Sequence, residues 1–252
     1  MFNWKERLRA AGIHLLISLA IAGLAAGLVF GLWYPDVYRE LSGGRELFLL
    51  VVSVDVVMGP LITLAIFNRK KPRKELRRDL AIVGLLQLAA LCYGLWTVYI
   101  ARPVHLVFEY NRFRVVHAIE VPEELLAQTP PGISALPLTG PTTLSLRPFK
   151  DNKEQFDSTL AAVGGVSLSA RPDLWQPYEA ARAEVLKEAK PVPALRQRFA
   201  TRSSEIDAAV AATGRSADAL VYVPLVGRKT FWTVLLDPAN ARILGFLPLD
   251  SF

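Results

Sequence analysis

The chain has 252 residues, 52% of them apolar, and a formal net charge of +6 at pH 7. The apolar excess and the charge are both concentrated in the first hundred residues, because residues 101–252 are nearly balanced, with 17 Lys and Arg against 16 Asp and Glu. A nucleic-acid-binding protein needs a basic stripe on a soluble face, so the composition argues against that class.

Three apolar runs lie in this first part, at residues 13–33, 47–67 and 80–100. Each is long enough to cross a hydrocarbon core of about 30 Å at about 1.5 Å per helical residue. The first run is longer than the apolar part of a signal peptide and ends in Trp33 and Tyr34, a pair typical of a membrane interface. The sequence therefore predicts three transmembrane helices over residues 1–100, with the first helix retained as an anchor.

The distribution of cations predicts how these helices are oriented, since Lys and Arg in short loops are retained in the cytoplasm. The N-terminal tail is basic, and so is the loop between the second and third runs, with Arg69, Lys70, Lys71, Arg73, Lys74, Arg77 and Arg78. The loop between the first and second runs mixes cations with acids. We therefore expect an inner-membrane protein with a cytoplasmic N-terminus, a periplasmic region from residue 101 to 252, and a basic loop that touches anionic lipid head groups.

A stripe of small residues marks the first helix. Gly23, Gly27 and Gly31 recur at a spacing of four, which places them on one face where another backbone can approach closely. The stripe predicts a helix-packing face, either for the chain's own second or third helix or for a helix of another protein.

Asp55 lies near the middle of the second apolar run, where a charged carboxylate costs about 2.5 to 3.5 kcal/mol. Gly59 and Thr63 share its helix face, and Pro60 removes one backbone donor and loosens the preceding turn. Gln87 of the third helix is placed to donate to Asp55 or to a carbonyl freed by Pro60. These five residues form a candidate partner-binding site within the membrane. Three interpretations of Asp55 follow: an internal hydrogen bond, a contact with a partner, or a proton or ion path.

The segments "DVVMGPLITLAIF", "DLAIVGLLQLAALCYG" and "RPVHLVFEYNRFRVVHA" resemble the TfpX/TfpZ family of type IV pilin accessory proteins in the order and spacing of their residues. The resemblance covers roughly residues 1–120. It implies an inner-membrane protein that assists the assembly or surface display of a major pilin by chaperone-like handling, alongside other pilus assembly proteins. Pilins present an apolar N-terminal helix with a free amine in the membrane, so Asp55 is a candidate partner for that amine.

Residues 101–252 predict a periplasmic α+β domain with an antiparallel sheet and helices on one face. A hairpin is expected over residues 105–117 with its turn at Asn111 and Arg112, a register that places Glu109 opposite Arg114.

The rest of this domain follows from local patterns. A loop rich in proline and glycine is expected at residues 122–148. The later patterns predict helices at 152–163, 174–188 and 194–212, a strand at 219–226 and a final hairpin at 229–249. Asn240 is expected to be the left-handed residue of the last turn.

Catalytic signatures are missing from the exported region: the sequence has no nucleophile elbow, Walker loop, dinucleotide-binding glycine pattern or histidine-pair zinc motif. His105 and His117 fall on opposite faces of the predicted hairpin, and Cys92 lies in the third apolar run, so neither a metal site nor a disulfide is expected. We therefore expect a non-enzymatic protein without a cofactor. The alternatives are a membrane-anchored sensor or scaffold for another periplasmic ligand, and an enzyme acting on pilin or glycan.

Overall fold

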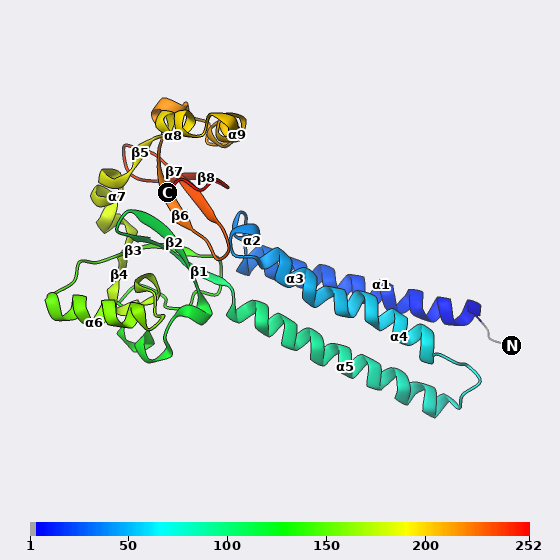
Figure 1. The fold of residues 1–252 in the computed structure, drawn as a ribbon. Helices are drawn as coiled ribbons and strands as arrows, with labels where there is room; N and C mark the ends of the chain where they lie inside the picture. The colour runs from blue at the N-terminus through cyan, green and yellow to red at the C-terminus, as the bar shows by residue number, and fades with distance from the viewer. Residues whose placement is uncertain (1–3) are drawn as a thin grey trace. The chain divides into compact units, whose positions relative to one another are not determined.

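The computed structural model describes residues 4–252 of the chain, which divides into two compact units, Met1–Ala101 and Arg102–Phe252 (Figure 1). The first unit is built from long apolar helices, and the second contains a sheet with short helices around it.

The first unit contains three helices that are long and apolar enough to cross a membrane, spanning Trp4–Trp33, Gly44–Ile66 and Arg73–Ile100. The prediction of three membrane-spanning helices is therefore confirmed, and the first helix begins well before the apolar run does. The first span is α1 (Trp4–Leu28) with a π-helical end, η1 (Val29–Trp33). The second comprises α3 (Gly44–Ser53), the π-helical η2 (Val54–Met58) and α4 (Gly59–Ile66); the third is α5 (Arg73–Ile100), and the short α2 (Tyr38–Leu41) joins the first two.

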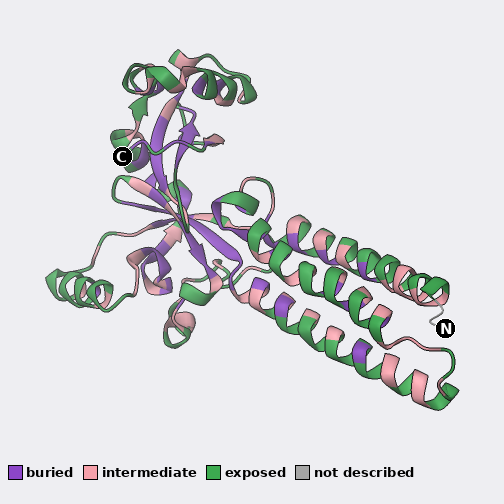
Figure 2. Ribbon diagram, turned by 45° about the vertical axis from the view of Figure 1, so that its right-hand side comes forward, coloured by how far each residue is buried: buried purple, intermediate pink, exposed green. Residues whose placement is uncertain are grey.

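Large apolar side chains on these helices point outward, as in Leu24, which is 78% exposed, and Leu85, which is 66% exposed. Figure 2 shows the same contrast between the exposed helices and the mostly buried strands of the second unit. Apolar surface of this extent is unfavourable in water and favourable in lipid, so the helical unit is the membrane part of the protein.

The three helices meet at one end of the membrane unit. There a cluster joins all of them, made of Ala25, Val29, Trp33, Tyr34, Phe48 and Val98. The Tyr34 hydroxyl donates to the Val98 carbonyl at 3.0 Å, and the Trp33 and Tyr99 rings lie 5.2 Å apart. At the opposite end, Arg7 of α1 donates to the carbonyls of Leu64 and Ala65 at 3.3 and 3.0 Å, which satisfies the last turn of α4.

The second unit contains an eight-stranded sheet with the order β4-β3-β1-β2-β6-β7-β8, and β5 pairs with β6. The strands are β1 (Pro103–Glu109), β2 (Arg112–His117), β3 (Thr142–Leu146), β4 (Trp175–Pro177), β5 (Lys190–Pro191), β6 (Val221–Val226), β7 (Phe231–Leu236) and β8 (Ile243–Leu247). The α+β prediction is confirmed, but the sheet is mixed, because β1 pairs with β3 and β2 with β6 in parallel. Strand β3 lies inside the segment predicted as a loop.

The turn of the hairpin between β1 and β2 was predicted at Asn111 and Arg112. In the structure it lies one residue earlier, at Tyr110 and Asn111. Tyr110 takes a left-handed φ of 55°, and Glu109 pairs with Arg112, so the predicted pairing of Glu109 with Arg114 is wrong. The observed register makes Phe108 and Phe113 direct partners with their rings 5.4 Å apart, and it adds a 3.0 Å ion pair between Arg112 and Glu109. Packing of aromatic side chains across the strands favours this register over the predicted one.

The helices of the second unit are α6 (Asn152–Val163), α7 (Arg182–Glu188), α8 (Val192–Arg198) and α9 (Ser203–Ala212). The prediction for 152–163 is confirmed. The prediction for 174–188 is wrong in its first half, because Trp175 is buried, donates to the Ser169 carbonyl at 2.8 Å and belongs to β4. The predicted helix at 194–212 is interrupted at Phe199, which has a non-helical φ of −118° and ψ of 50°.

Short 3₁₀ turns connect these elements: η3 (Ala118–Glu120), η4 (Glu123–Gln128), η5 (Leu168–Ala170), η6 (Pro172–Leu174), η7 (Tyr178–Ala181), η8 (Ala200–Arg202) and η9 (Ala217–Ala219). In the last hairpin the left-handed residue is Ala241, with a φ of 57°, and not Asn240. The Asn240 side chain instead accepts a 2.9 Å hydrogen bond from the backbone N–H of Arg242, so it contributes to the turn through its amide.

Two apolar clusters hold the sheet and the elements packed on it. One joins α8 and α9 to the C-terminal strands through Leu195, Ile206, Tyr222, Leu235 and Leu247. The other joins η5 and β4 to the first three strands through Val107, Val116, Leu144, Ala170 and Trp175. The C-terminal unit therefore has a substantial apolar core of its own.

Candidate functional site

Asp55 lies in the π-helical turn η2, in the middle of the second membrane helix. In a π-helix the N–H of residue i bonds to the carbonyl of residue i−5, so the donor for the Asp55 carbonyl would be residue 60. Residue 60 is proline, which has no N–H. The side-chain Nε2 of Gln87 donates to the Asp55 carbonyl at 3.2 Å. Gln87 thus replaces the backbone donor that Pro60 lacks. Of the two roles expected for Gln87, this is the hydrogen bond to a carbonyl freed by Pro60.

Gly59 makes this hydrogen bond sterically possible. A Cβ atom at position 59 would overlap the Gln87 side-chain amide, and the atoms in conflict are Nε2, Cδ and Oε1. The lack of a side chain therefore lets α5 bring Gln87 against the backbone of the second helix. Asp55, Gly59, Pro60 and Gln87 form one contiguous arrangement.

One oxygen of the Asp55 carboxylate is left without a hydrogen bond in the described part of the chain. The residue is 9% exposed, and its Oδ1 has no hydrogen-bond partner among residues 4–252. Gln87 bonds to the main chain of Asp55, so this internal hydrogen bond does not satisfy the carboxylate. An unpaired buried carboxylate is costly, and the cost is removed only by protonation or by a partner.

The carboxylate lines a cavity of about 170 Å³ within the membrane unit. The second helix contributes Asp55 and Val52, and it packs against both outer helices. The outer helices form the two walls: α1 provides His14, Ile17, Ser18, Ile21 and Ala22, and α5 provides Gly84, Gln87, Leu88 and Leu91. The cavity is apolar except for a few polar groups gathered around Asp55, as expected of a specific binding site.

Thr63 lies two helical turns from Asp55 on the same helix, is 3% exposed, and has its Oγ1 2.6 Å from Nδ1 of His14. His14 was not among the predicted site residues, although it lines the Asp55 cavity. The sequence contains a pattern that could have indicated His14. His14 and Ser18 are polar residues four apart in the first apolar run, which places them on one helix face, and both line the cavity.

The glycine stripe of α1 lies outside this arrangement. Gly23, Gly27 and Gly31 are exposed, and no heavy atom lies within 4 Å of the position that a Cβ would take at any of them. Helix α1 packs instead through buried residues on the opposite face, including Ser18 and Ala25. Within the described part of the chain, the stripe therefore does not serve the chain's own helix packing.

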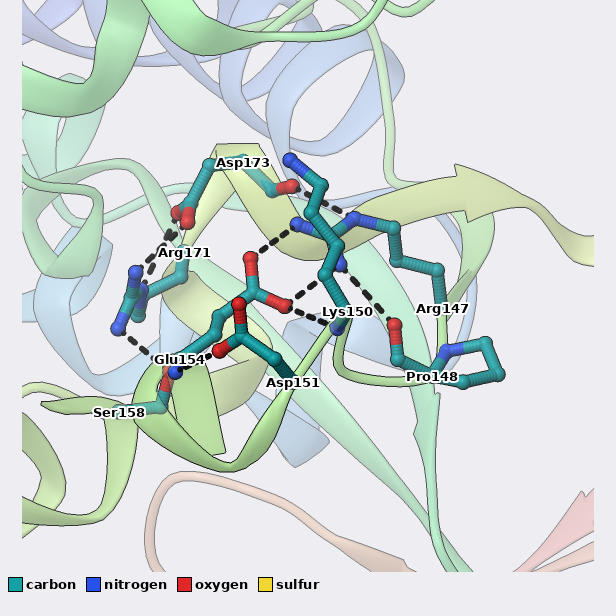
Figure 3. Close-up of polar contacts among 8 residues, drawn as sticks. All are labelled: Arg147, Pro148, Lys150, Asp151, Glu154, Ser158, Arg171 and Asp173. Carbon is teal, nitrogen blue, oxygen red and sulfur yellow. Dashed lines mark hydrogen bonds and ion pairs between the residues drawn. The ribbon is translucent and has the colours of Figure 1, made fainter. Parts of the chain in front are cut away.

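A second polar cluster lies in the C-terminal unit and fixes α6 (Figure 3). Arg147 donates to both carboxylate oxygens of Glu154 at 2.9 and 2.7 Å, and Arg171 donates to Ser158 at 2.9 Å and to Asp173 at 3.1 and 2.6 Å. The hydrogen bonds from Arg147 lower the pKa of Glu154 to about 2. Because its charged groups bond to one another, the arrangement is that of a structural anchor. Among residues 4–252, no group of three or more His, Cys, Asp or Glu is placed to hold a metal ion.

Comparison with known proteins gives a consistent result over nearly the whole length. Residues 2–43 match the family described as Fimbrial assembly protein FimB. The chain is 33% identical over 249 residues to "Fimbrial assembly protein, serogroup I" of Dichelobacter nodosus, which covers 97% of this chain and 95% of that protein. It is 32% identical over 249 residues to the serogroup E1 protein of the same organism, with the same coverage. No solved structure matches the chain.

Proposed function

This chain belongs to the family of fimbrial assembly proteins, and from that membership we propose that it assists the assembly of a type IV pilus as a non-enzymatic, chaperone-like membrane factor. We assign it to the TfpX/TfpZ type of pilin accessory proteins. The proposal rests most directly on one observation: the buried residue Asp55 lines an intramembrane cavity, and no group of residues 4–252 forms a hydrogen bond to its Oδ1.

The proposed partner is the major pilin before its extraction from the membrane. The apolar N-terminal helix of the pilin would lie against the cavity between α1 and α5, with its free amine beside Asp55. An amine and a carboxylate that are both expensive in lipid neutralise each other when paired, and the pair is strong in a medium of low dielectric constant. The pairing would set the depth of the pilin helix in the membrane, and it would give Asp55 Oδ1 the partner that residues 4–252 do not provide.

The proposed location is the bacterial inner membrane, with the N-terminus and the loop after α4 in the cytoplasm and residues 102–252 in the periplasm. The seven cations between Arg69 and Arg78 support this orientation. The C-terminal domain follows α5 almost directly, since α5 ends at Ile100 and β1 begins at Pro103. Only Ala101 and Arg102 separate these two elements, so the periplasmic region begins directly after the third membrane helix.

Site-specific photocrosslinking tests the proposed partner. A photoreactive amino acid at Leu88, which lines the cavity, is expected to form an adduct with the N-terminal helix of the pilin. The matched control is Leu86, which lies on the opposite side of α5, is 67% exposed and lines neither this cavity nor the other one in the membrane unit. Asp55→Asn should strongly reduce the adduct from Leu88 and the surface piliation, since losing one member of a buried ion pair costs about 3–5 kcal/mol.

Two results would contradict the proposal. One is equal crosslinking of pilin from Leu88 and Leu86, which would indicate contact without a specific site. The other is the absence of pilin from the Leu88 adduct together with unchanged piliation in the Asp55→Asn variant. A different periplasmic or membrane protein in the adduct would favour the scaffold function instead.

A further inference from the structure

A second, larger cavity of about 680 Å³ lies in the membrane unit, toward the end that carries the basic loop. It adjoins the Asp55 cavity, because His14, Ile17 and Gly84 line both. Its other lining residues include Glu6, Arg9 and Ile13 of α1, Arg69 of the loop after α4, and Leu80 of α5. Neither the family assignment nor the proposed contact with pilin gives this cavity a role.

The charged residues of this cavity carry a net positive charge. Arg69 forms a 3.4 Å ion pair with Glu6, in which both side chains keep contact with the surroundings. Arg9 is exposed and forms no ion pair within residues 4–252. The lining therefore holds two guanidinium groups and one carboxylate, which leaves one positive charge uncompensated.

The charged residues of this cavity lie near the ends of the helices, and its apolar residues lie further toward the middle of the membrane unit. Arg9 lies one turn before Ile13 and two turns before Ile17 on α1, so these apolar side chains lie about 6 and 12 Å further along the helix. Arg69 follows the last residue of α4, Ile66, at the same end of the unit. The arrangement is a cationic entrance at the level of the lipid head groups with an apolar interior toward the bilayer centre.

We propose that this cavity binds one monoanionic phospholipid of the phosphatidylglycerol class. Its phosphate would lie between Arg9 and Arg69, and one acyl chain would follow Ile13, Ile17 and Leu80 between α1 and α5. A phosphate compensates the extra positive charge, and Arg binds phosphate oxygens with geometrically matched donors. A zwitterionic choline lipid brings its own cation and is disfavoured, and so is the cationic amine of a pilin helix.

Lipid titration of the purified full-length chain in detergent, followed by native mass spectrometry, tests this proposal. Phosphatidylglycerol should bind about tenfold more tightly than phosphatidylcholine with the same acyl chains, because each nearby cation contributes about 1 kcal/mol. The double variant Arg9→Gln/Arg69→Gln should abolish most of this preference. The matched control, Arg73→Gln/Arg77→Gln, removes the same charge from exposed positions that do not line the cavity, and it should leave the preference within about twofold.

Two further variants distinguish a specific site from misfolding. Glu6→Gln frees Arg69 from its acidic partner, and it should increase the affinity for phosphatidylglycerol about fivefold, a gain that a damaged fold does not produce. Gly84→Leu should block the acyl chain, since no heavy atom lies within 4 Å of the Cβ position of Gly84 and the new side chain has room to enter the cavity. Gly23→Leu, on the outer face of α1, is its control and should bind lipid as the parent chain does.

Equal binding of the two lipids would overturn the proposal, and so would an equal loss in the Arg73/Arg77 control, which would show a diffuse surface effect. A dimer that retains no lipid would assign the cavity to a second copy of the chain. The experiment contains no pilin, so its failure leaves the proposed pilin contact unaffected, and the failure of the crosslinking experiment leaves this lipid site unaffected.

Discussion

Two buried residues show how single side chains depend on their surroundings in this protein. Asp55 is costly in lipid, yet the surrounding backbone is arranged around it: the π turn and Pro60 free its carbonyl, Gly59 provides space, and Gln87 supplies the hydrogen bond. Such turns occur frequently at functional sites, which fits a carboxylate that is held in position but left available.

His105 in β1 is the corresponding buried residue of the C-terminal unit. It is fully buried, its Nδ1 lies 2.7 Å from Thr142 Oγ1, its Nε2 lies 3.0 Å from the Ala135 carbonyl, and its ring lies 4.3 Å from that of Trp175. Burial lowers the pKa of His105 from 6.5 to about 4. The ring is therefore neutral in the folded protein at neutral pH, with Nε2–H donating to Ala135 and Nδ1 accepting from Thr142.

This pKa predicts that the C-terminal unit loses stability in acid. Above pH 6.5 the ring is neutral in both the folded and the unfolded state, and between pH 6.5 and about 4 only the unfolded state binds the proton. The loss across this range amounts to roughly 3 kcal/mol. Urea unfolding of the full chain in detergent, followed by tryptophan fluorescence at several pH values, should show this loss in the parent chain and a flatter dependence in His105→Asn.

The control for this prediction is Val107→Ala, a core substitution in the same strand that lowers stability without removing a titrating group. It should shift the unfolding free energy at every pH and keep the slope of the parent chain. An unchanged slope in His105→Asn would contradict the assignment of the acid sensitivity to this ring.

Among the elements, helix α6 has an unusual distribution of polarity. Its packed side carries Glu154 and Ser158, which bond to Arg147 and Arg171, whereas its outer side carries Phe156, Leu160 and Val163, which are 67%, 61% and 82% exposed. The helix is therefore attached through charged hydrogen bonds rather than through apolar packing. Bonds of this type contribute about 1.5–3 kcal/mol each.

Removing the Glu154 charge should loosen α6 selectively. Glu154→Gln is expected to accelerate amide hydrogen exchange in residues 152–163 about tenfold, since it weakens the two bonds from Arg147, while the sheet amides keep their protection. Asp157→Asn is a suitable control, because it removes an exposed carboxylate from the same helix that lies outside the cluster of Figure 3. Equal exchange in the two variants would show that the cluster does not hold the helix.

For the whole molecule, the charge distribution predicts opposite sides of the membrane for the basic loop and the C-terminal unit. Single cysteines test this in a Cys92→Ser background. In cells with a permeabilised outer membrane, a membrane-impermeant maleimide should label Lys153→Cys and should label Lys74→Cys only after lysis. Labelling of Lys74→Cys in unlysed cells would reverse the proposed orientation.

The membrane spans and α6 were predictable because their signals are local: hydropathy over a run of residues, and a helical pattern over residues 152–163. The errors occur where distant segments compete with such local signals. Trp175 is drawn into β4 by pairing with β3, and β3 itself forms through a parallel pairing with β1 across a segment rich in proline. The register of the first hairpin is an error of another kind, because it arises within one short segment, where the contact of Phe108 with Phe113 favours the observed pairing.

The sequence by itself determined that this protein crosses the membrane with three helices. It also determined that the second helix carries Asp55, Gly59 and Pro60 within two helical turns near its middle. These properties depend on the transfer free energy and backbone chemistry of consecutive residues. Only the tertiary structure decided that Gln87 bonds to the Asp55 carbonyl and leaves the Oδ1 of its carboxylate unpaired in a cavity, while no other part of the described chain packs on the glycine stripe of α1. These outcomes depend on which helix faces approach one another, and that choice is made by packing between residues far apart in the chain.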